Sequence, residues 1–243
     1  MSFSTLPPEI CGAICAEVKE LRGNLAVLCT TSRNFCREAQ RILYHSVDLQ
    51  GREMRATKSW ARAVTQYTHL AERMHALTLQ LPSIESLDVS DIAKIVKVLS
   101  RCINLKELCG VPECMISACP FRLQKFENLA PFKGWWDDDF WKTQTEIRVL
   151  SLTYFPPSLE NQLPVPNLIA LRIAVLHNLP ERPLQRVETG FHTDLTPLAR
   201  YSRTLTTLNL QGEWYLSPIT QILAAIAASF PSLLHLIGKT PPR

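Results

Sequence analysis

The sequence predicts an α/β protein in which a small three-helix head precedes an irregular solenoid of parallel strands and helical returns. Two observations predict this fold: apolar residues recur at helical spacing over the first fifty residues, and a strand-like pattern then recurs roughly every 23 residues. The 243 residues are 46% hydrophobic with a formal net charge of +4, so the chain can bury a sizeable core. We expect a head at 1–50, a helical linker at 51–73 and a repeating body at 74–243.

The head is expected to hold three short amphipathic helices. Pro7 and Pro8 suit the first turn of a helix, where a missing N–H costs little. One apolar stripe follows on that helix, made of Ile10, Ile14, Val18 and Leu21. Asn24 is expected to cap a second helix, and a third follows from Phe35 before the chain becomes extended. Helices this short bury little core by themselves, so we expect the head to pack against a further element outside it.

The linker is expected to be one helix from Thr57, as its N-cap, to Ala71. It is also locally basic, and we interpret the basic residues as the solvated face of a helix rather than as a polyanion site. They are Arg52, Arg55, Lys58, Arg62 and Arg73, against Glu53 and Glu72.

In the body, an apolar residue is followed three and five positions later by further apolar or small residues, as in Leu205-Leu208-Leu210. The last two positions alternate as in a β-strand. The copies begin at residues 74, 105, 123, 147, 168, 184, 205 and 233. Their mean step lies within the 20–29 residues of leucine-rich repeats, in which each unit has an apolar edge that only its neighbour can cover. Return helices are expected at 91–102, at 193–202 and after Ser217-Pro218. An ordinary α/β domain with leucine-rich parallel strands is the alternative.

The order of motifs in the head resembles an F-box. The stretch 6–10, Leu-Pro-Pro-Glu-Ile, is similar to the Leu-Pro-x-Glu-(Ile/Leu) opening of that family. The stretch 43–49 resembles the Leu-Tyr-x-x-Val-x-Leu ending that is common in fungal members. Between them, five residues fall where the family has Leu…Val-Cys-(Lys/Arg)-x-(Trp/Phe)…Ala: Leu25, Leu28, Arg33, Phe35 and Ala39. The resemblance covers residues 5–50, and repeats are the usual companion of an F-box.

This resemblance implies a substrate-recognition adaptor of a Skp–cullin–F-box ubiquitin ligase that is not itself an enzyme. The head would dock on a Skp-type adaptor, and through it on a cullin, while the repeats bind an unknown protein target. The residues expected to contact the adaptor are Leu6, Pro7, Ile10, Leu25, Leu28 and Phe35. The alternative for such side chains is the head's own core or packing on the helix that holds Trp60, which we favour for Ile14, Val18 and Ala39. For the whole chain, the alternatives are a repeat scaffold without a ligase role and an α/β enzyme with its site at strand ends.

Two places are candidates for binding the target. Residues that alternate with the buried leucines of such repeats face outward from the sheet, and those singled out here are Arg172, Thr207, Asn209 and Gln211. The second place combines tryptophans with carboxylates and suits a basic peptide. Its residues are Trp135, Trp136, Asp137 and Asp138. The plainer interpretation is that an aspartate caps a helix at 138–144 while the tryptophans cover the edge of a repeat.

No motif indicates catalysis, a cofactor or a metal site. A Gly-x-Ser-x-Gly elbow, a phosphate loop and His-Glu-x-x-His are absent from the sequence, and the eight cysteines lack zinc spacing. We expect those thiols to be reduced and mostly buried. The small net charge does not call for nucleic acid as a partner.

The sequence also lacks the features of membrane or secreted proteins. The longest apolar run, 219–230, is too short to span a bilayer, and the N-terminus lacks the basic start of a signal peptide. We therefore expect a cytoplasmic or nuclear protein. Arg243 follows the last strand pattern closely without a capping segment, which predicts an exposed apolar edge around Leu233 and Leu236.

Overall fold

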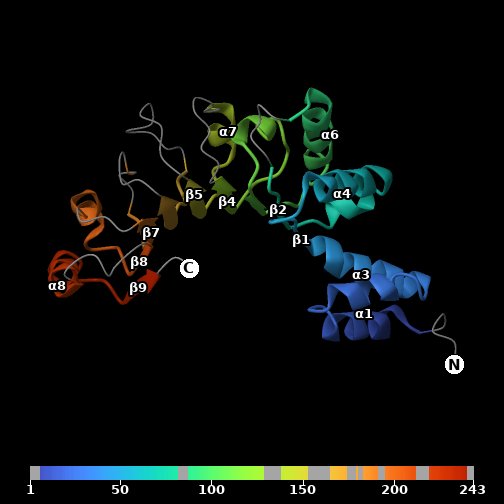
Figure 1. The fold of residues 1–243 in the computed structure, drawn as a ribbon, viewed down its shortest axis with the longest axis horizontal. Coiled ribbons are helices and arrows are strands. Elements are labelled where there is room, and N and C mark those ends of the chain that lie inside the picture. Colours follow the sequence, from blue (N-terminus) through green and yellow to red (C-terminus); the bar gives the residue numbers. More distant parts are fainter. Residues whose placement is uncertain are drawn as a thin grey trace. The chain divides into compact units, whose positions relative to one another are not determined.

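The computed structural model describes residues 6–81, 87–128, 138–152, 165–173, 179, 183–190, 195–211 and 219–239. It divides into two compact units, one of Met1–Val111 with Ala118–Phe121 and one of Pro112–Ser117 with Arg122–Arg243. Strands in both units run parallel to the strands they pair with, and helices connect many of them (Figure 1). The α/β class with parallel strands is therefore confirmed.

The first unit opens with the three expected helices, α1 (Pro8–Glu17), α2 (Arg22–Leu28) and α3 (Arg33–His45). Ser32 caps α3, because its hydroxyl oxygen accepts a hydrogen bond of 3.3 Å from the backbone N–H of Phe35. The cap expected at Asn24 is wrong. Asn24 lies inside α2, whose N-cap position is Leu21.

The three helices enclose a small core of their own. Its fully buried residues are Cys11, Cys15, Leu25, Phe35 and Ala39. Val18 packs half-buried against this core, as expected, and Ala39 lies within it. The expectation for Ile14 is wrong, since this side chain is 37% exposed. The face of α1 that packs inward is the neighbouring stripe of cysteines, whose i, i+4 spacing matches that of Ile10 and Ile14.

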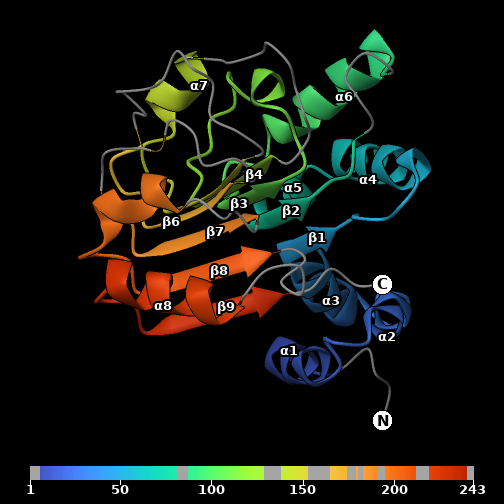
Figure 2. The same cartoon turned by 60° about the vertical axis from the view of Figure 1, so that its left-hand side comes forward.

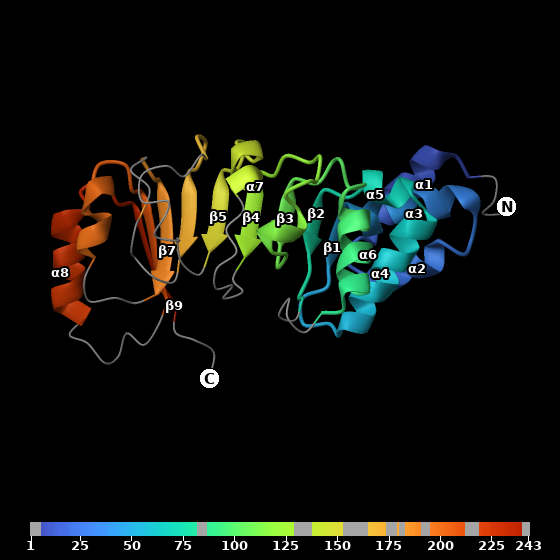
Figure 3. The same cartoon turned by 90° about the horizontal axis from the view of Figure 1, so that it is seen from above.

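The rest of the first unit combines three helices with three strands. These are α4 (Met54–Gln66), α5 (His69–Glu72), α6 (Val89–Leu99), β1 (Ser46–Asp48), β2 (Ala76–Thr78) and β3 (Glu107–Cys109). The single helix expected at 57–71 is thus two helices. Thr57 is buried inside α4 and does not cap it, because Glu53 occupies the N-cap position. β1, β2 and β3 pair in that order, and α4 lies beside α6 (Figure 3).

The second unit holds six parallel strands that pair in the order of the chain (Figure 2). They are β4 (Lys125–Asn128), β5 (Val149–Leu152), β6 (Ala170–Ile173), β7 (Arg186–Gly190), β8 (Thr207–Gln211) and β9 (His235–Lys239). Its helical segments are the 3-10 helices η3 (Glu113–Met115) and η5 (Thr196–Tyr201) and the α-helices α7 (Asp138–Thr143) and α8 (Ile219–Ser229). The return helices expected at 193–202 and after Ser217-Pro218 correspond to η5 and α8, and that expected at 91–102 to α6.

All eight strands that the repeating pattern predicts are present, and β1 precedes them. In the second unit, the middle apolar residues of the six copies pair in register across the sheet. This apolar row consists of Phe126, Leu150, Leu171, Val187, Leu208 and Leu236. The first five are fully buried, because each packs between neighbouring strands.

An apolar edge lies at β9, the last strand that the structure describes. Leu233 and Leu236 are only half-buried, and Leu234 is 75% exposed. The two leucines named in the expectation are thus partly covered, and the exposed apolar side chain next to them is Leu234.

The eight cysteines, all within the described residues, are reduced thiols, four of them buried and four partly buried. Burial raises the pKa of Cys102 to about 12 and that of Cys119 to about 11, so these thiols act as small apolar side chains. Within the described part of the chain, no helix combines the length and apolarity needed to cross a membrane.

Candidate functional site

The first candidate site is an apolar surface on α1 of the head. Ile10 and Ile14 lie one turn apart on this helix and are 48% and 37% exposed. Pro7 and Pro8 precede them and are exposed too. We call these four residues the α1 face. Exposed isoleucines next to a closed core are surface that another polypeptide can bury.

The segment that leads into α1 is held by α3. Asn34 donates a hydrogen bond of 2.9 Å from its side-chain amide to the backbone carbonyl of Leu6. The thiol of Cys11 points to the same carbonyl oxygen at 3.9 Å. Leu6 is thereby fixed against the core, and Pro7, the N-cap residue of α1, is left outside it.

The six residues expected to contact the adaptor occupy three environments. Leu25 and Phe35 are fully buried inside the head. Leu6 and Leu28 are half-buried against its core. Only Pro7 and Ile10 are exposed. Sequence reasoning placed Ile14 inside, although its i+4 spacing from Ile10 was a signal that the two share one face.

The second candidate site is a polar row across the sheet of the second unit. Arg172 of β6 lies between two glutamates, with its guanidinium 3.3 Å from a carboxylate oxygen of Glu127 on β4 and 3.2 Å from one of Glu188 on β7. Gln211 of β8 also donates a hydrogen bond to Glu188. Side chains from β4, β7 and β8 thus join Arg172 of β6 in one network. This network fixes the position of the guanidinium charge.

The ion pair between Arg172 and Glu127 reaches across the intervening strand β5 at the position of Ser151. In the strand register Ser151 pairs with Glu127 on one side and Arg172 on the other. It is a small side chain and only 4% exposed, so the two charged side chains can meet above it. Asn209 continues the row beyond Glu188, and its Oδ1 has no hydrogen-bond partner within the described residues.

The structure brings together two of the four sheet residues predicted to bind the target. Arg172 and Gln211 meet at Glu188, whereas Asn209 is buried and Thr207 is half-buried at the start of β8. Sequence reasoning missed Glu127 and Glu188. Glu127 and Glu188 follow the middle residues of the copies that begin at 123 and 184, so the same alternation applied to those copies would have placed them in this row.

The tryptophan-rich segment is described only in part. Trp135, Trp136 and Asp137 lie outside the described residues, and Asp138 is the first residue of α7. The third tryptophan, Trp141, is buried, with its ring centroid 6.0 Å from that of Phe126 and 4.9 Å from that of Phe140. Trp141 is thus a core residue of the second unit and packs on Phe126 of β4.

Among the residues that the structure describes, no group of three His, Cys, Asp or Glu side chains could hold a metal ion. No protein-family model matches the chain, and a search of curated proteins finds no match either.

Proposed function

We propose that this chain is a non-catalytic adaptor, the substrate receptor of a Skp–cullin–F-box ubiquitin ligase. In this proposal the head docks on a Skp-type adaptor through the α1 face, and the body binds a protein target. The observation that carries the proposal is that the head has a closed core and still exposes Ile10 and Ile14 beside it.

The energetics of docking support this use of the α1 face. Full burial of an isoleucine side chain stabilises a complex by about 1.5–3 kcal/mol relative to full exposure. Ile10 is about half exposed, so about 1 kcal/mol is available from it, and a comparable amount from Ile14. Small apolar anchors of this kind gain further when a rim of neighbouring contacts excludes water from them.

The buried members of the expected set have a different role in this proposal. Leu25 and Phe35 form the core on which α1 packs, so they position the α1 face and do not contact the adaptor. This revises the contact set to Pro7, Pro8, Ile10 and Ile14, with the half-buried Leu6 and Leu28 at its margin.

The polar row of the second unit suits the other half of the proposal. The guanidinium and carboxylates of Glu127, Arg172 and Glu188 are ordered by one another and remain partly exposed. A preorganised row of this kind can recognise a charged protein surface at a low entropic cost. The receptor would act by proximity, because a bound target is held at high effective concentration near the ligase.

Co-expression of the full chain with a Skp-type adaptor tests the proposal. We expect the two to co-purify, and we expect Ile10→Asp to abolish co-purification. Ile103→Asp is the matched control, because Ile103 is 55% exposed and lies outside the head. It should co-purify like the unmodified chain.

Two outcomes would contradict the proposal. A monodisperse chain that never co-purifies with the adaptor would favour a scaffold without a ligase role. Equal losses for Ile10→Asp and Ile103→Asp would show that the α1 face is not the docking surface.

A further inference from the structure

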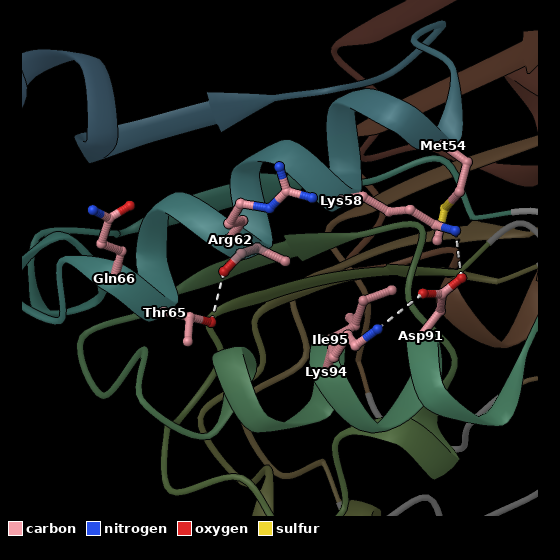
Figure 4. Close-up of a pocket in the computed structure, with 9 residues that line it drawn as sticks. Met54, Lys58, Arg62, Thr65, Gln66, Asp91, Lys94 and Ile95 are labelled. Carbon is pink, nitrogen blue, oxygen red and sulfur yellow. Dashed lines mark hydrogen bonds and ion pairs between the residues drawn. The ribbon is translucent and has the colours of Figure 1, made fainter.

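A groove between α4 and α6 in the first unit combines an apolar floor with a cationic rim (Figure 4). Its volume is about 420 Å³, within the range of pockets that bind ligands. The apolar lining consists of Met54, Ala61 and Ile95. Ala61 and Ile95 are buried side chains that also pack inside the unit, so the floor is fixed by the fold.

The rim carries three cations and one carboxylate. Asp91 at the start of α6 is 2.6 Å from the ammonium of Lys58 on α4 and 3.8 Å from that of Lys94, one turn further along α6. The hydrogen bond from Lys58, with the charge of Lys94, holds the pKa of Asp91 below its usual value. Its carboxylate is therefore ionised and shared between two lysines. The lining keeps an excess of positive charge.

The guanidinium of Arg62 has N–H donors that no described residue uses. It projects from α4 at the groove, is exposed, and has no ion pair or hydrogen bond to any residue that the structure describes. The neighbouring polar side chains are occupied: the hydroxyl of Thr65 donates to the carbonyl of Ala61 at 2.7 Å, and the amide of Gln66 to the hydroxyl of Tyr67 at 3.2 Å. A guanidinium with free donors binds carboxylates in a bidentate manner.

The lining favours one class of anion over the others. Single-stranded nucleic acids are held by aromatic side chains on which bases stack, and the lining contains no aromatic residue. Small-molecule pockets place buried polar groups toward the ligand, whereas the buried polar residue of this groove, Asp91, already faces two lysines. Exposed cations above aliphatic side chains are complementary to an acidic peptide that carries aliphatic residues.

We propose that the α4–α6 groove binds an acidic peptide segment of a partner protein, with an aliphatic side chain on Ala61 and Ile95 and carboxylates at Arg62 and Lys94. Lys58 stays with Asp91, which it contacts at the shorter distance. The site is separate from the α1 face, and its existence does not depend on the docking of the head.

Calorimetric titration of the full chain tests this site. The probe is a short blocked peptide in which two leucines stand among glutamates. We expect saturable binding that weakens as salt is raised, because exposed charges are screened. A peptide with glutamine in place of glutamate, and one with serine in place of leucine, should each bind more weakly.

Substitutions in the chain locate the binding. Arg62→Gln and Lys94→Gln should each weaken binding about threefold, and the double variant about tenfold. Arg203→Gln is the matched control, because Arg203 is exposed, lies in the second unit and does not line the groove. Circular dichroism checks that each variant is folded.

Three results would overturn the inference. These are no binding of the acidic peptide, equal binding of its glutamine counterpart, and equal affinity of the Arg62→Gln/Lys94→Gln variant and the unmodified chain. Tighter binding of a short single-stranded RNA than of the peptide, lost on the same substitutions, would assign the groove to nucleic acid instead.

Discussion

The backbone of Gly110 passes against the carbonyl oxygen of Leu79, so closely that a Cβ atom on Gly110 would lie 1.8 Å from that oxygen. The approach occurs where the N–H of Leu79 donates to the carbonyl of Cys109 at 2.9 Å, just after β2 and β3 end. Gly110 also has a φ of +75°, a conformation that L side chains rarely adopt.

Gly110→Ala should therefore be one of the most damaging single substitutions in the first unit. The clash is with backbone, which cannot move without breaking the pairing of β2 and β3, so we expect a loss of about 3 kcal/mol or more. Gly51→Ala is the control. Gly51 has a φ of +69° but no atom within 4 Å of its Cβ position, so about 1 kcal/mol of strain is expected. Urea unfolding measures both, and equal losses would contradict the role of the contact.

Adjacent residues of α1 should lose very different amounts of stability on the same substitution. Cys11→Asp places a charge in a fully buried position and should cost about 3 kcal/mol or more. Ile10→Asp changes an exposed side chain in the first helical turn, where a negative charge is favourable, and should cost at most about 1 kcal/mol. Thermal unfolding of the two variants makes the comparison. A large loss for Ile10→Asp would mean that Ile10 belongs to the core.

Stability should fall as the pH drops below about 6.5 because of His75. Burial, the nearby His45 and the charge of Lys106 together lower the pKa of His75 from its usual value of 6.5. The rings of His45 and His75 have centroids 4.5 Å apart and planes tilted by 34°. Since the folded state favours the neutral ring, the contribution is complete above the unfolded pKa and is lost as the pH falls toward the lower folded value.

Thermal melts between about pH 7 and pH 5.5 measure this dependence. His75→Gln should flatten it, whereas His235→Gln, at an exposed position of β9, should not. An unchanged pH dependence in His75→Gln would assign the effect to other groups.

Ser151 should be intolerant of larger side chains although it lies among charged residues. Ser151→Leu would fill the space in which Glu127 and Arg172 meet above β5. We expect a loss of about 1–3 kcal/mol from overpacking and from the broken pair. Arg172→Gln alone removes partly exposed ion pairs and should cost only about 0.5–1 kcal/mol. Equal losses would indicate that the charge network, and not the space above Ser151, dominates.

The strands could be predicted because the repeating pattern marks the residues whose side chains must be buried. In Leu205-Leu208-Leu210 the alternation of the last two leucines sets which side chains point inward, and the strand follows from it. The same holds for the copy that begins at residue 123, although its last position is the polar Asn128. Because the apolar row must be buried, neighbouring strands have little freedom in the register at which they pair.

The helix starts and the packed face of α1 were harder to predict. Asp91 suits an N-cap by residue type, but it lies inside α6 and pairs with Lys58 on another helix, while Asp88 takes the N-cap position. Capping depends on backbone conformation, which residue type alone does not determine. On α1, the stripe of cysteines and the stripe of isoleucines have the same period, so periodicity cannot decide between them.

The polar row was predicted in part for a similar reason. Arg172 and Gln211 follow from alternation on single strands, but their meeting at Glu188 depends on the pairing of neighbouring strands. That pairing is a long-range property, and it becomes visible only when the copies are aligned with one another.

The apolar row from Phe126 to Leu236 has a kinetic consequence. The inner members of the row, from Leu150 to Leu208, each pack against the strands just before and just after them in the chain, so most contacts close loops of similar, modest length. Assembly can therefore start at any neighbouring pair of strands and spread outward. The half-buried Leu236 costs least to release, so opening should begin at β9 and proceed backward, with amide-exchange protection rising from β9 toward β7.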